Sequence, residues 1–472
     1  MGLGDERPRA MSGTAAMSGR HATVVGGGLA GIAAALELAR AGASVTLMES
    51  RGRLGGAAYS FSREGLMADN GQHVFLRCCT AYRELVEELG AGDGVALQDR
   101  LEIAVLAPGR RRAWLRRSGL PAPLHLAGSL LRYPFLGLRG RVGVARAMQG
   151  LAGVDVDDPA ADARSFGDWL REAGQSGAAV EAIWELIARP TLNLRVQDAS
   201  LAQAAQVFQV GLLSDCASGD IGHARVPLGQ IHDVAAQAAL RRAGVSVRLR
   251  CGATRVTADA EGGRFSVEAH GGAAAVVCDM VVLAVPPDRA VRLTPAQAGI
   301  DPRIAERLGG SPIVNLHVVY DRPVLDVEFA AGVGTPVQWV FDRTQSAGVS
   351  EGQYLVVSLS AADEELGMSR PDLEARYLPA LADLLPAAGS AGVLKFFVTR
   401  DHAATFRAAP GARAWRPGPR TALPGLALAG AWTDTGWPAT MEGAVRSGRA
   451  AALEVSRPAV EASVDGLAVS RA

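Results

Sequence analysis

A glycine-rich segment near the N-terminus carries the first residues that could do chemistry. A β-branched run at residues 23–25 leads into Gly26, Gly28 and Gly31, spaced G-x-G-x-x-G, and Glu49 follows roughly 20 residues later. In such a pattern the glycines form a tight turn, admit a pyrophosphate and allow close helix packing, while the acid accepts hydrogen bonds from ribose hydroxyls. The segment therefore predicts a dinucleotide site. The alternative is a glycine-rich turn without a ligand.

The elements that must position these residues follow from the hydrophobic pattern. Apolar residues at helical spacing run from Ile32 to a helix end at Gly42, and residues 44–48 alternate as a second strand. A strand, a glycine turn, a helix and a second strand form the βαβ context that this fingerprint needs. We therefore predict an α/β fold with a Rossmann-like nucleotide-binding domain.

The segment after Glu49 favours FAD over NAD. Arg53, Gly55 and Gly56 complete the pattern E-x-x-x-R-x-G-G, which resembles the FAD-dependent amine oxidase and phytoene desaturase superfamily. The resemblance implies that the arginine contacts the FAD phosphates and that the two glycines let the backbone pass close to the cofactor. This chain has Ala57 where many members carry a further arginine.

A second strand–turn–helix pattern lies near the C-terminus. Residues 426–429 are apolar, Ala431 stands where the superfamily has an acidic residue, and Pro438 suits the first position of a helix. In the superfamily this helix directs its positive end at the pyrimidine edge of the flavin, which is negative when reduced. The resemblance therefore adds five residues to the predicted cofactor site: Gly430, Trp432, Thr440, Met441 and Glu442.

Two longer segments narrow the resemblance. ADNGQHVFL (residues 68–76) and WTDTGWPATMEGAVRSG (residues 432–448) together resemble the hydroxysqualene dehydroxylases, also called squalene-associated FAD-dependent desaturases. The segments PIVNLHVVYDRPV and PVQWVFDR occur in the expected order. The resemblance implies reductive conversion of hydroxysqualene to squalene in hopanoid-related synthesis. FAD is then the cofactor, a C30 isoprenoid alcohol is the substrate, and the electron donor is unknown.

This reaction sets requirements for the residues near the flavin. The hydroxyl is allylic, so its loss leaves a delocalised cation that hydride can quench, and the protein must supply an acid and a dry apolar tunnel. His73 is the first candidate for the polar group beside the flavin, and Asp434 is the second. A structural role for His73 in the turn at residues 69–72 is the alternative. Trp432 and Trp437 are expected at the flavin edge, in the tunnel or in the core.

The element pattern predicts two discontinuous domains. The FAD-binding domain is expected at residues 21–90, 222–299 and 405–456, and by resemblance Val256 offers its backbone to the adenine. The substrate domain, a mixed sheet with helices, is expected at residues 91–221 and 300–404, where Pro379 interrupts a helix. Residues 1–20 and 457–472 are expected to be disordered extensions, and residues 1–20 lack the apolar core of a signal peptide.

Composition narrows the classes of partner. The 48 basic and 48 acidic residues cancel, which argues against a nucleic-acid binder. The five cysteines contain no C-x-x-C pair, so neither a disulfide framework nor a metal site is expected, and a reducing cytoplasm is the expected location. No uncharged apolar run reaches the ~18 residues of a membrane span.

One stretch of the substrate domain is strongly basic. No acidic residue occurs between Glu102 and Asp155, whereas nine arginines alternate with leucines and aromatics in residues 110–146. This pattern is typical of a surface that lies on anionic lipid. We therefore expect a peripheral protein on the inner face of the cell membrane. The alternative is an arginine-rich helical cap on the substrate domain.

Two other functions remain open from the sequence. An oxidising relative, such as a carotenoid-type desaturase or an amine oxidase, would use the same cofactor site. A flavin-linked lysine is common in amine oxidases, and Lys395 is the single lysine here. A non-enzymatic prenyl-lipid carrier with this fold is the other alternative, which the acid at Glu49 and the basic group at Arg53 argue against.

Overall fold

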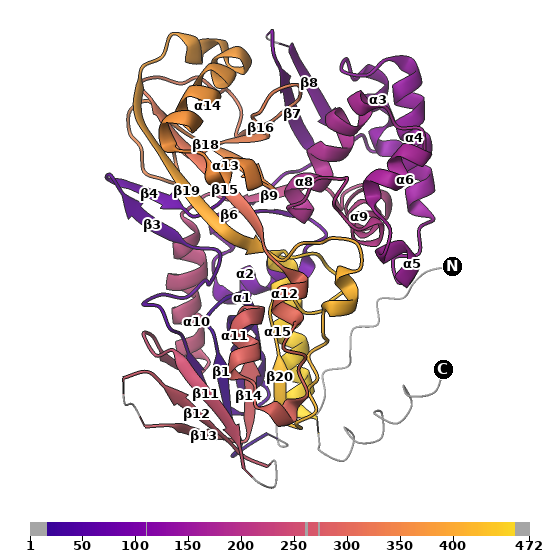
Figure 1. The fold of residues 1–472 in the computed structure, drawn as a ribbon. Coiled ribbons are helices and arrows are strands. Elements are labelled where there is room, and N and C mark those ends of the chain that lie inside the picture. Colours follow the sequence, from indigo (N-terminus) through magenta and orange to yellow (C-terminus); the bar gives the residue numbers. More distant parts are fainter. Residues whose placement is uncertain (1–16, 110, 260–262, 272–273, 458–472) are drawn as a thin grey trace.

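Three stretches of chain that are distant in sequence supply one parallel sheet. The computed structural model describes residues 17–109, 111–259, 263–271 and 274–457 (Figure 1). The sheet has the order β10-β2-β1-β14-β20. Its strands are β1 (His21–Val25), β2 (Ser44–Met48), β10 (Ser246–Arg248), β14 (Met280–Leu283) and β20 (Leu426–Leu428). The predicted βαβ unit is thus present, and the α/β prediction is confirmed.

Both faces of this sheet are covered, as a parallel sheet requires. On one face lie the helices α1 (Leu29–Arg40), α2 (Thr80–Leu89), α10 (Ala236–Arg242) and α15 (Met441–Ser456). On the other face lies an antiparallel sheet of β11 (Ala253–Ala258), β12 (Phe265–Ala269) and β13 (Val276–Cys278). Side chains alternate accordingly: Val24 packs toward the helices, and Val25 packs toward the antiparallel sheet.

A second sheet forms most of the other lobe (Figure 1). Its order is β19-β15-β18-β17-β16-β7-β8. The strands are β7 (Glu102–Ala107), β8 (Arg111–Arg116), β15 (Ser311–Tyr320), β16 (Phe329–Gly332), β17 (Trp339–Asp342), β18 (Gln353–Ser360) and β19 (Val393–Thr405). Helix α14 (Arg370–Leu384) covers one face and runs continuously through Pro379, so the predicted interruption is wrong.

The central strand β15 presents a different set of residues to each side. Val314, Leu316 and Val318 pack against α14. The residues between them face the cofactor-binding lobe, because Val319 packs with Leu66 in another cluster. The second sheet therefore lies beside the first lobe. The side chains of the odd-numbered residues of β15 point toward that lobe.

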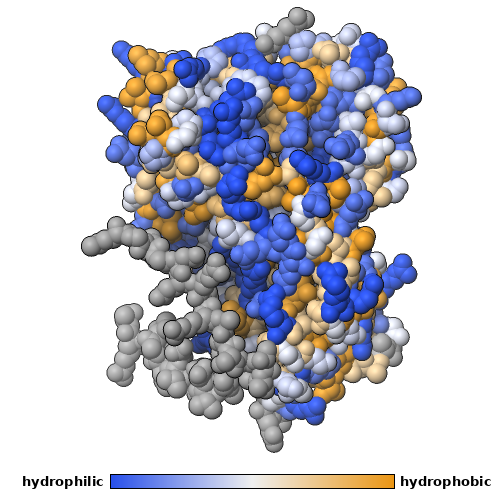
Figure 2. All heavy atoms as spheres, turned by 180° about the vertical axis from the view of Figure 1, so that it is seen from behind, coloured by the Kyte–Doolittle hydropathy of each residue, from blue (hydrophilic) through white to orange (hydrophobic). Residues whose placement is uncertain are grey.

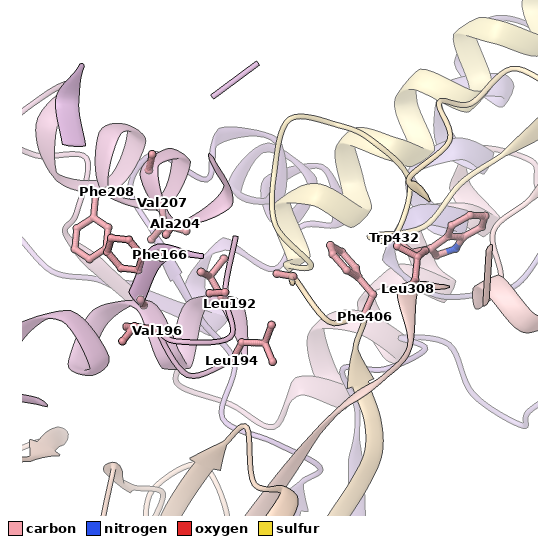
Figure 3. Close-up of a cluster of buried hydrophobic side chains, with 14 of the residues drawn as sticks. Phe166, Leu192, Leu194, Val196, Ala204, Val207, Phe208, Leu308, Phe406 and Trp432 are labelled. Carbon is pink, nitrogen blue, oxygen red and sulfur yellow. The ribbon is translucent and has the colours of Figure 1, made fainter. Parts of the chain in front are cut away.

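Small helices form the remaining wall. They are α3 (Ala127–Arg132), α4 (Leu138–Ala152), α5 (Pro159–Asp162), α6 (Phe166–Glu172), α7 (Gly177–Ala179), α8 (Leu186–Leu192) and α9 (Leu201–Phe208), with π-helical turns at Val180–Glu185 and Gln209–Leu213. Phe166, Trp184 and Phe208 pack edge to face or tilted, with ring centroids 5.2–5.9 Å apart. Figure 3 shows Phe166 and Phe208 at one end of a core that extends through Leu308 and Phe406 to Trp432.

Short elements connect the lobes. They are the pair β3 (Ser60–Arg63) and β4 (Leu66–Asp69) and the sheet of β5 (Val74–Leu76), β9 (Ile221–Ala224) and β6 (Val95–Leu97). Helix α11 (Pro287–Leu293) packs on β11 and on α12 (Ile304–Leu308), and α13 (Asp363–Gly367) packs on β15. The domain boundary predicted between residues 221 and 222 falls inside β9. This strand pairs with β5 and β6, so it ties the two predicted domains together.

The disordered extensions predicted at residues 1–20 and 457–472 need two corrections. Met17 is buried in the core of the first lobe with 4% of its surface exposed, so the ordered chain begins before residue 21. Arg457 caps α15 and pairs with Glu454 at 3.2 Å. The remainder of the two predicted extensions, residues 1–16 and 458–472, lies outside the described residues. Among the described helices, none has both the length and the apolar character needed to cross a bilayer.

The two long helices of the first lobe touch through their backbones. A Cβ atom at Gly448 of α15 would lie 2.0 Å from the carbonyl oxygen of Ala30 in α1. Small residues at this crossing let α15 approach the glycine turn, and the crossing holds both helix N-termini in place.

We expect Gly448→Ala to separate the two helices and destabilise the protein. The overpacking should cost about 1–3 kcal/mol, and thermal unfolding followed by circular dichroism measures it. Gly177→Ala is the control, because a Cβ at Gly177 meets nothing within 4 Å. Equal melting temperatures for the two variants would contradict the close approach of α1 and α15.

Candidate cofactor and active site

The glycine turn leaves the N-terminus of α1 open. Gly26 has φ +106°, and a Cβ there would lie 2.2 Å from the carbonyl oxygen of Ala284. A Cβ at Gly31 would lie 1.8 Å from the carbonyl oxygen of Gly26. Gly28 is the N-cap and has no side chain to bond the first-turn amides, which also lack intrahelical acceptors. These amides form a ready anion site, as the sequence predicts.

Glu49 lies directly beneath this turn. Its carboxylate is 7% exposed and accepts hydrogen bonds from the Gly27 amide at 2.7 Å, the Arg51 amide at 2.7 Å and the Ser50 hydroxyl at 3.1 Å. A carboxylate has about four acceptor sites, so one remains for a ligand hydroxyl. Glu49 therefore both fixes the glycine turn and can bind a ribose.

The segment that follows Glu49 folds back against the turn. Gly56 has φ +57°, and a Cβ there would lie 2.8 Å from Gly28 Cα. The Arg53 guanidinium donates to the carbonyls of Leu54 and Gly56 and stacks 3.5 Å above the ring centroid of Tyr59. Burial lowers the pKa of Arg53. The predicted cofactor residues Gly28, Arg53 and Gly56 thus form one cradle.

A buried histidine that the sequence reasoning missed supports this cradle. His232 donates from Nδ1 to the carbonyl of Ala58 at 3.1 Å and accepts at Nε2 from the Tyr82 hydroxyl at 3.0 Å. The next residue, Asp233, accepts from the Leu54 amide at 2.9 Å. Burial lowers the pKa of His232 to about 4, so the ring is neutral at physiological pH.

Asn70 connects the cradle to the segment that carries His73. Its side chain accepts from the Tyr59 amide and donates to the Ala57 carbonyl, at 2.9 and 2.8 Å. Its own carbonyl accepts from Nδ2 of Asn315 on β15 at 3.1 Å. The loop at residues 53–58, the turn at residues 69–73 and the second sheet therefore meet at one residue.

His73 lines a pocket between this turn and the second sheet. Its ring donates from Nδ1 to the Gly71 carbonyl at 3.1 Å, which leaves Nε2 as an acceptor, and burial lowers the pKa of the ring. The pocket is lined by Asp69, Gln72, His73, Val74, His223, Ala224, Leu228, Glu328, Phe329, Phe341, Asp342 and Arg343. Of these residues, only His73 is predicted as a site residue from the sequence.

Two contacts between ionisable side chains also lie at this pocket. Arg343 donates to Asp69 at 3.0 Å, and both side chains are at most 10% exposed. His223 places Nε2 3.7 Å from a Glu328 oxygen, while its Nδ1 is buried without a hydrogen-bond partner among the described residues. Burial lowers the pKa of His223. His317, by contrast, is used within its sheet, since it bonds Tyr354 and Thr399.

A buried arginine organises the C-terminal turn. Arg416 donates to the carbonyls of Ala431, Trp432, Thr433 and Trp437, at distances of 2.6–3.4 Å. Burial lowers the pKa of Arg416 to about 10. Ala431 stands where an acidic residue is expected. The turn that contains Ala431 is held instead through its backbone carbonyl oxygens, which accept hydrogen bonds from Arg416.

The side chains of this turn serve the packing of the protein. The Trp432 indole is 6% exposed, donates to the Val285 carbonyl at 2.9 Å and lies in the core near Phe406 (Figure 3). Asp434 lies 3.4 Å from Arg413 and is partly exposed. No contact among the described residues joins Asp434 to His73, so the two catalytic candidates are not brought together.

Helix α15 begins later than the sequence suggests. The first helical residue is Met441 and Thr440 is the N-cap, accepting from the Gly443 amide at 3.2 Å, so the prediction that Pro438 starts the helix is wrong. The Glu442 side chain accepts from the Ala81 and Tyr82 amides of α2. The Glu442 side chain is thus used by α2, and of the first-turn amides those of Met441 and Glu442 remain for a ligand.

The other predicted cofactor residues also contribute backbone. Gly430 has φ +140°, and its amide donates to Ser447 at 2.8 Å. Val256 is buried on β11, the edge strand of the antiparallel sheet, so alternate backbone groups of that strand face away from β12. Two open helix N-termini, one buried acid and one glycine cradle together fit a dinucleotide cofactor.

Comparisons with known proteins agree with this geometry. The family model described as flavin containing amine oxidoreductase matches residues 29–456. The hydroxysqualene dehydroxylase of Rhodopseudomonas palustris is 30% identical over 91% of this chain and 96% of its own length. That of Sinorhizobium fredii is 28% identical over 93% and 99%. The 15-cis-phytoene desaturase of Narcissus pseudonarcissus is 25% identical over 93% and 79%.

Solved structures show the same fold. A putrescine oxidase variant superposes with a TM-score of 0.70 at 22% identity, over 92% of this chain and 98% of the other. Cyclohexylamine oxidase from Brevibacterium oxydans superposes with a TM-score of 0.66 at 18% identity, over 93% and 98%. With these findings the predicted cofactor, FAD, is confirmed.

We expect Glu49→Gln to weaken FAD binding roughly 10- to 100-fold, because hydrogen bonds to a charged group contribute about 1.5–3 kcal/mol. The amide would also present a donor to the Gly27 or Arg51 amide. Titration of the apoprotein with FAD, followed by flavin fluorescence, measures the dissociation constant. Glu351→Gln, on the exposed surface, is the control. Unchanged affinity of the Glu49 variant would refute the ribose role.

We expect the buried His232 to make the free energy of unfolding depend on pH. The unfolded chain binds a proton near pH 6.5, whereas the folded protein does so only near pH 4. The free energy of unfolding should therefore fall as the pH drops from 7.5 to 5, by about 2 kcal/mol from this residue.

Urea unfolding of His232→Asn and of wild type at the two pH values separates this contribution. The variant should lose about 2 kcal/mol of the pH dependence, whatever its stability at pH 7.5. His270→Asn, which changes an exposed histidine, should keep the wild-type pH dependence. Parallel pH profiles for His232→Asn and wild type would show that His232 is not the responsible group.

Proposed function

The chain belongs to the flavin-containing amine oxidoreductase family and is an FAD-dependent oxidoreductase, and on this premise we propose that it converts hydroxysqualene to squalene. The similarity to two hydroxysqualene dehydroxylases over more than 90% of both chains is the observation that carries the proposal. The segments around His73 and Trp432 agree with that family.

The proposed reaction is a reductive loss of water. When bound, reduced FAD supplies the hydride that forms the new C–H bond, while the electron pair of the broken C–O bond leaves with oxygen. A proton must join this oxygen to release water. The chain therefore has to hold the hydroxyl, deliver one proton and keep other water away from an allylic cation.

His73 suits the holding of the hydroxyl. Its Nδ1 hydrogen is used by Gly71, and burial lowers the ring pKa, so the neutral ring offers Nε2 as an acceptor. A substrate hydroxyl that donates to Nε2 would be oriented within the pocket, with Phe329 and Phe341 as apolar walls. In this arrangement His73, the first candidate for the polar group beside the flavin, positions the leaving group.

The proton can come from the other side of the same pocket. Glu328 is largely exposed and lies 3.7 Å from His223 Nε2, while the ring itself is mostly buried. The Glu328 charge raises the pKa of His223 against the larger effect of burial. A proton taken from solvent at Glu328 would reach the pocket through His223, so this pair is our candidate for the acid.

An oxidising desaturase is the second candidate function, favoured by the similarity to 15-cis-phytoene desaturases at 24–25% identity. The position of the single lysine, Lys395, gives less support to the amine oxidase alternative. Lys395 lies on β19 and donates to the Glu64 carbonyl at the protein surface. The carrier alternative is set aside, because the chain belongs to an oxidoreductase family.

An anaerobic single-turnover experiment separates the two redox directions. The holoenzyme is reduced chemically, mixed with hydroxysqualene and followed by the absorbance of oxidised flavin. Reoxidation together with formation of squalene is expected. A flavin that stays reduced with hydroxysqualene, yet becomes reduced when the oxidised enzyme meets phytoene, would overturn the proposal in favour of a desaturase.

His73→Ala should slow that single turnover by about 10²-fold, the usual cost of a misplaced reacting group. The flavin spectrum and FAD affinity should be unchanged, because the ring contacts its own turn and not the cradle. His402→Ala, on the exposed part of β19, is the matched control. A His73 variant with the wild-type rate would leave the ring with the structural role only.

A further inference from the structure

Helices α3 and α4 expose a group of apolar side chains. Leu131 is 63% exposed, Leu138 is 69% exposed and Val142 is 45% exposed. Leu120 and Leu124, just before α3, are also more than half exposed. These residues stand apart from the inner side of α4, where Val144, Ala147 and Leu151 are buried. The exposed group is therefore not the core-facing side of the helix.

Three arginines are interspersed with these apolar residues. Arg132, Arg139 and Arg146 are exposed, and no hydrogen bond or ion pair to another described residue engages their side chains. On α4, Arg139 and Arg146 lie three residues before and four residues after Val142, so they share its face. We call Leu131, Arg132, Leu138, Arg139, Val142 and Arg146 the α3–α4 face.

The other described arginines of the basic stretch are engaged within the protein. Arg112 pairs with Asp326, Arg116 with Glu102, and Arg117 with Asp220. Arg141 donates to the carbonyls of Leu131 and Leu136. Among the described residues of the basic stretch, the arginines without a hydrogen bond or ion pair therefore belong to the α3–α4 face.

The charges on this face have no acidic neighbours within their own segment. Residues 103–154 contain no aspartate or glutamate. In the space-filling view from behind, hydrophobic and hydrophilic atoms are intermixed at the upper left, over α3 and α4 (Figure 2). A protein partner with a matching acidic surface would need no exposed leucines, and a purely apolar partner would need no free arginines.

From this combination we propose that the α3–α4 face docks on a membrane surface that contains anionic lipids. The arginines bind the headgroups, and Leu131, Leu138 and Val142 enter the boundary with the acyl chains. Amphipathic surfaces of this composition bind lipid by the sum of apolar burial and attraction to anionic headgroups. The proposal rests on surface chemistry and stands whether or not hydroxysqualene is the substrate.

An opening beside the face suits an apolar ligand that arrives from the membrane. A pocket of about 260 Å³ lies between the α3–α4 connection and the edge of the second sheet. Phe135 from the connection lines it, together with Pro108 and Val333, and one acidic residue, Glu181, also lies in the lining. Arg111 stacks 4.9 Å from the Phe135 ring at the same place. Docking would place this opening at the lipid surface.

Vesicle flotation of the holoenzyme tests the proposal. The wild-type protein should float with vesicles of phosphatidylcholine and phosphatidylglycerol at 3:1 and remain unbound with phosphatidylcholine alone. Raising the salt to 1 M, where the Debye length is about 3 Å, should weaken the binding. Equal binding to both kinds of vesicle, or binding to neither, would overturn the proposal.

Two variants assign the binding to the face. Arg132→Gln, Arg139→Gln and Arg146→Gln together should lower the partition coefficient roughly 100-fold, since each arginine near such a surface contributes about 5-fold. Leu131→Ser with Leu138→Ser should lower it at least roughly 10-fold. The leucine effect should persist at high salt, whereas the arginine effect should disappear.

A charge-matched control removes three other exposed arginines, Arg241, Arg255 and Arg370, which lie on elements remote from α3 and α4 (Figure 1). This variant should float like wild type. The flavin absorbance and melting temperature of every variant report whether the fold is intact. If the control loses as much binding as the face variant, the attraction is a general charge effect and the proposed surface is wrong.

Discussion

A buried ion pair holds the two lobes together at the place where the chemistry is expected. Asp69 accepts hydrogen bonds from the Ser60 hydroxyl, the Leu228 amide and the Arg343 guanidinium. Arg343 in turn donates to the Ala224 carbonyl at 2.7 Å. A buried carboxylate is tolerated only when its desolvation is offset in this way, and removal of one partner typically costs about 3–5 kcal/mol. Because each donor comes from a different element, the pair fixes the turn at residues 69–73 against the second sheet.

The position of β15 follows from this constraint. Once the turn is held, the Asn70 carbonyl meets Asn315, and the odd-numbered side chains of β15 face the cofactor-binding lobe. The same Asn70 bonds the loop of the glycine cradle. Hydrogen bonds of Asp69, Asn70 and Asn315 therefore link the glycine cradle, the turn at residues 69–73 and the second sheet. A shift of the sheet by one residue would turn Val314 or Leu316 toward the cofactor-binding lobe and leave apolar side chains where polar contacts are needed.

Sequence reasoning succeeded where the physical cause is local. The glycine turn, Glu49, Arg53 and the strand–turn–helix at both ends depend on spacing within a few dozen residues, so the α/β fold could be predicted. The start of α15 was predicted at the wrong residue, because two signals compete there. Pro438 suits the first helical position and Thr440 suits the N-cap, and the helix uses Thr440. His223, His232, Arg343 and Arg416 were missed for another reason. Each acts on groups that are distant in sequence or on backbone carbonyls, and no spacing rule describes such contacts.

The arginines show how burial decides the role of one residue type. In a chain with a single lysine, nearly all positive charge is carried by guanidinium groups, whose several donors can satisfy many acceptors at once. Arg416 is buried and uses these donors on four carbonyls, and Arg343 uses them on a carboxylate and a carbonyl. On α4, by contrast, Arg139 and Arg146 are exposed and have no hydrogen bond or ion pair to another described residue. A charge that is free beside exposed leucines contributes little to the stability of the fold, and this is why the proposed membrane contact is assigned to the α3–α4 face.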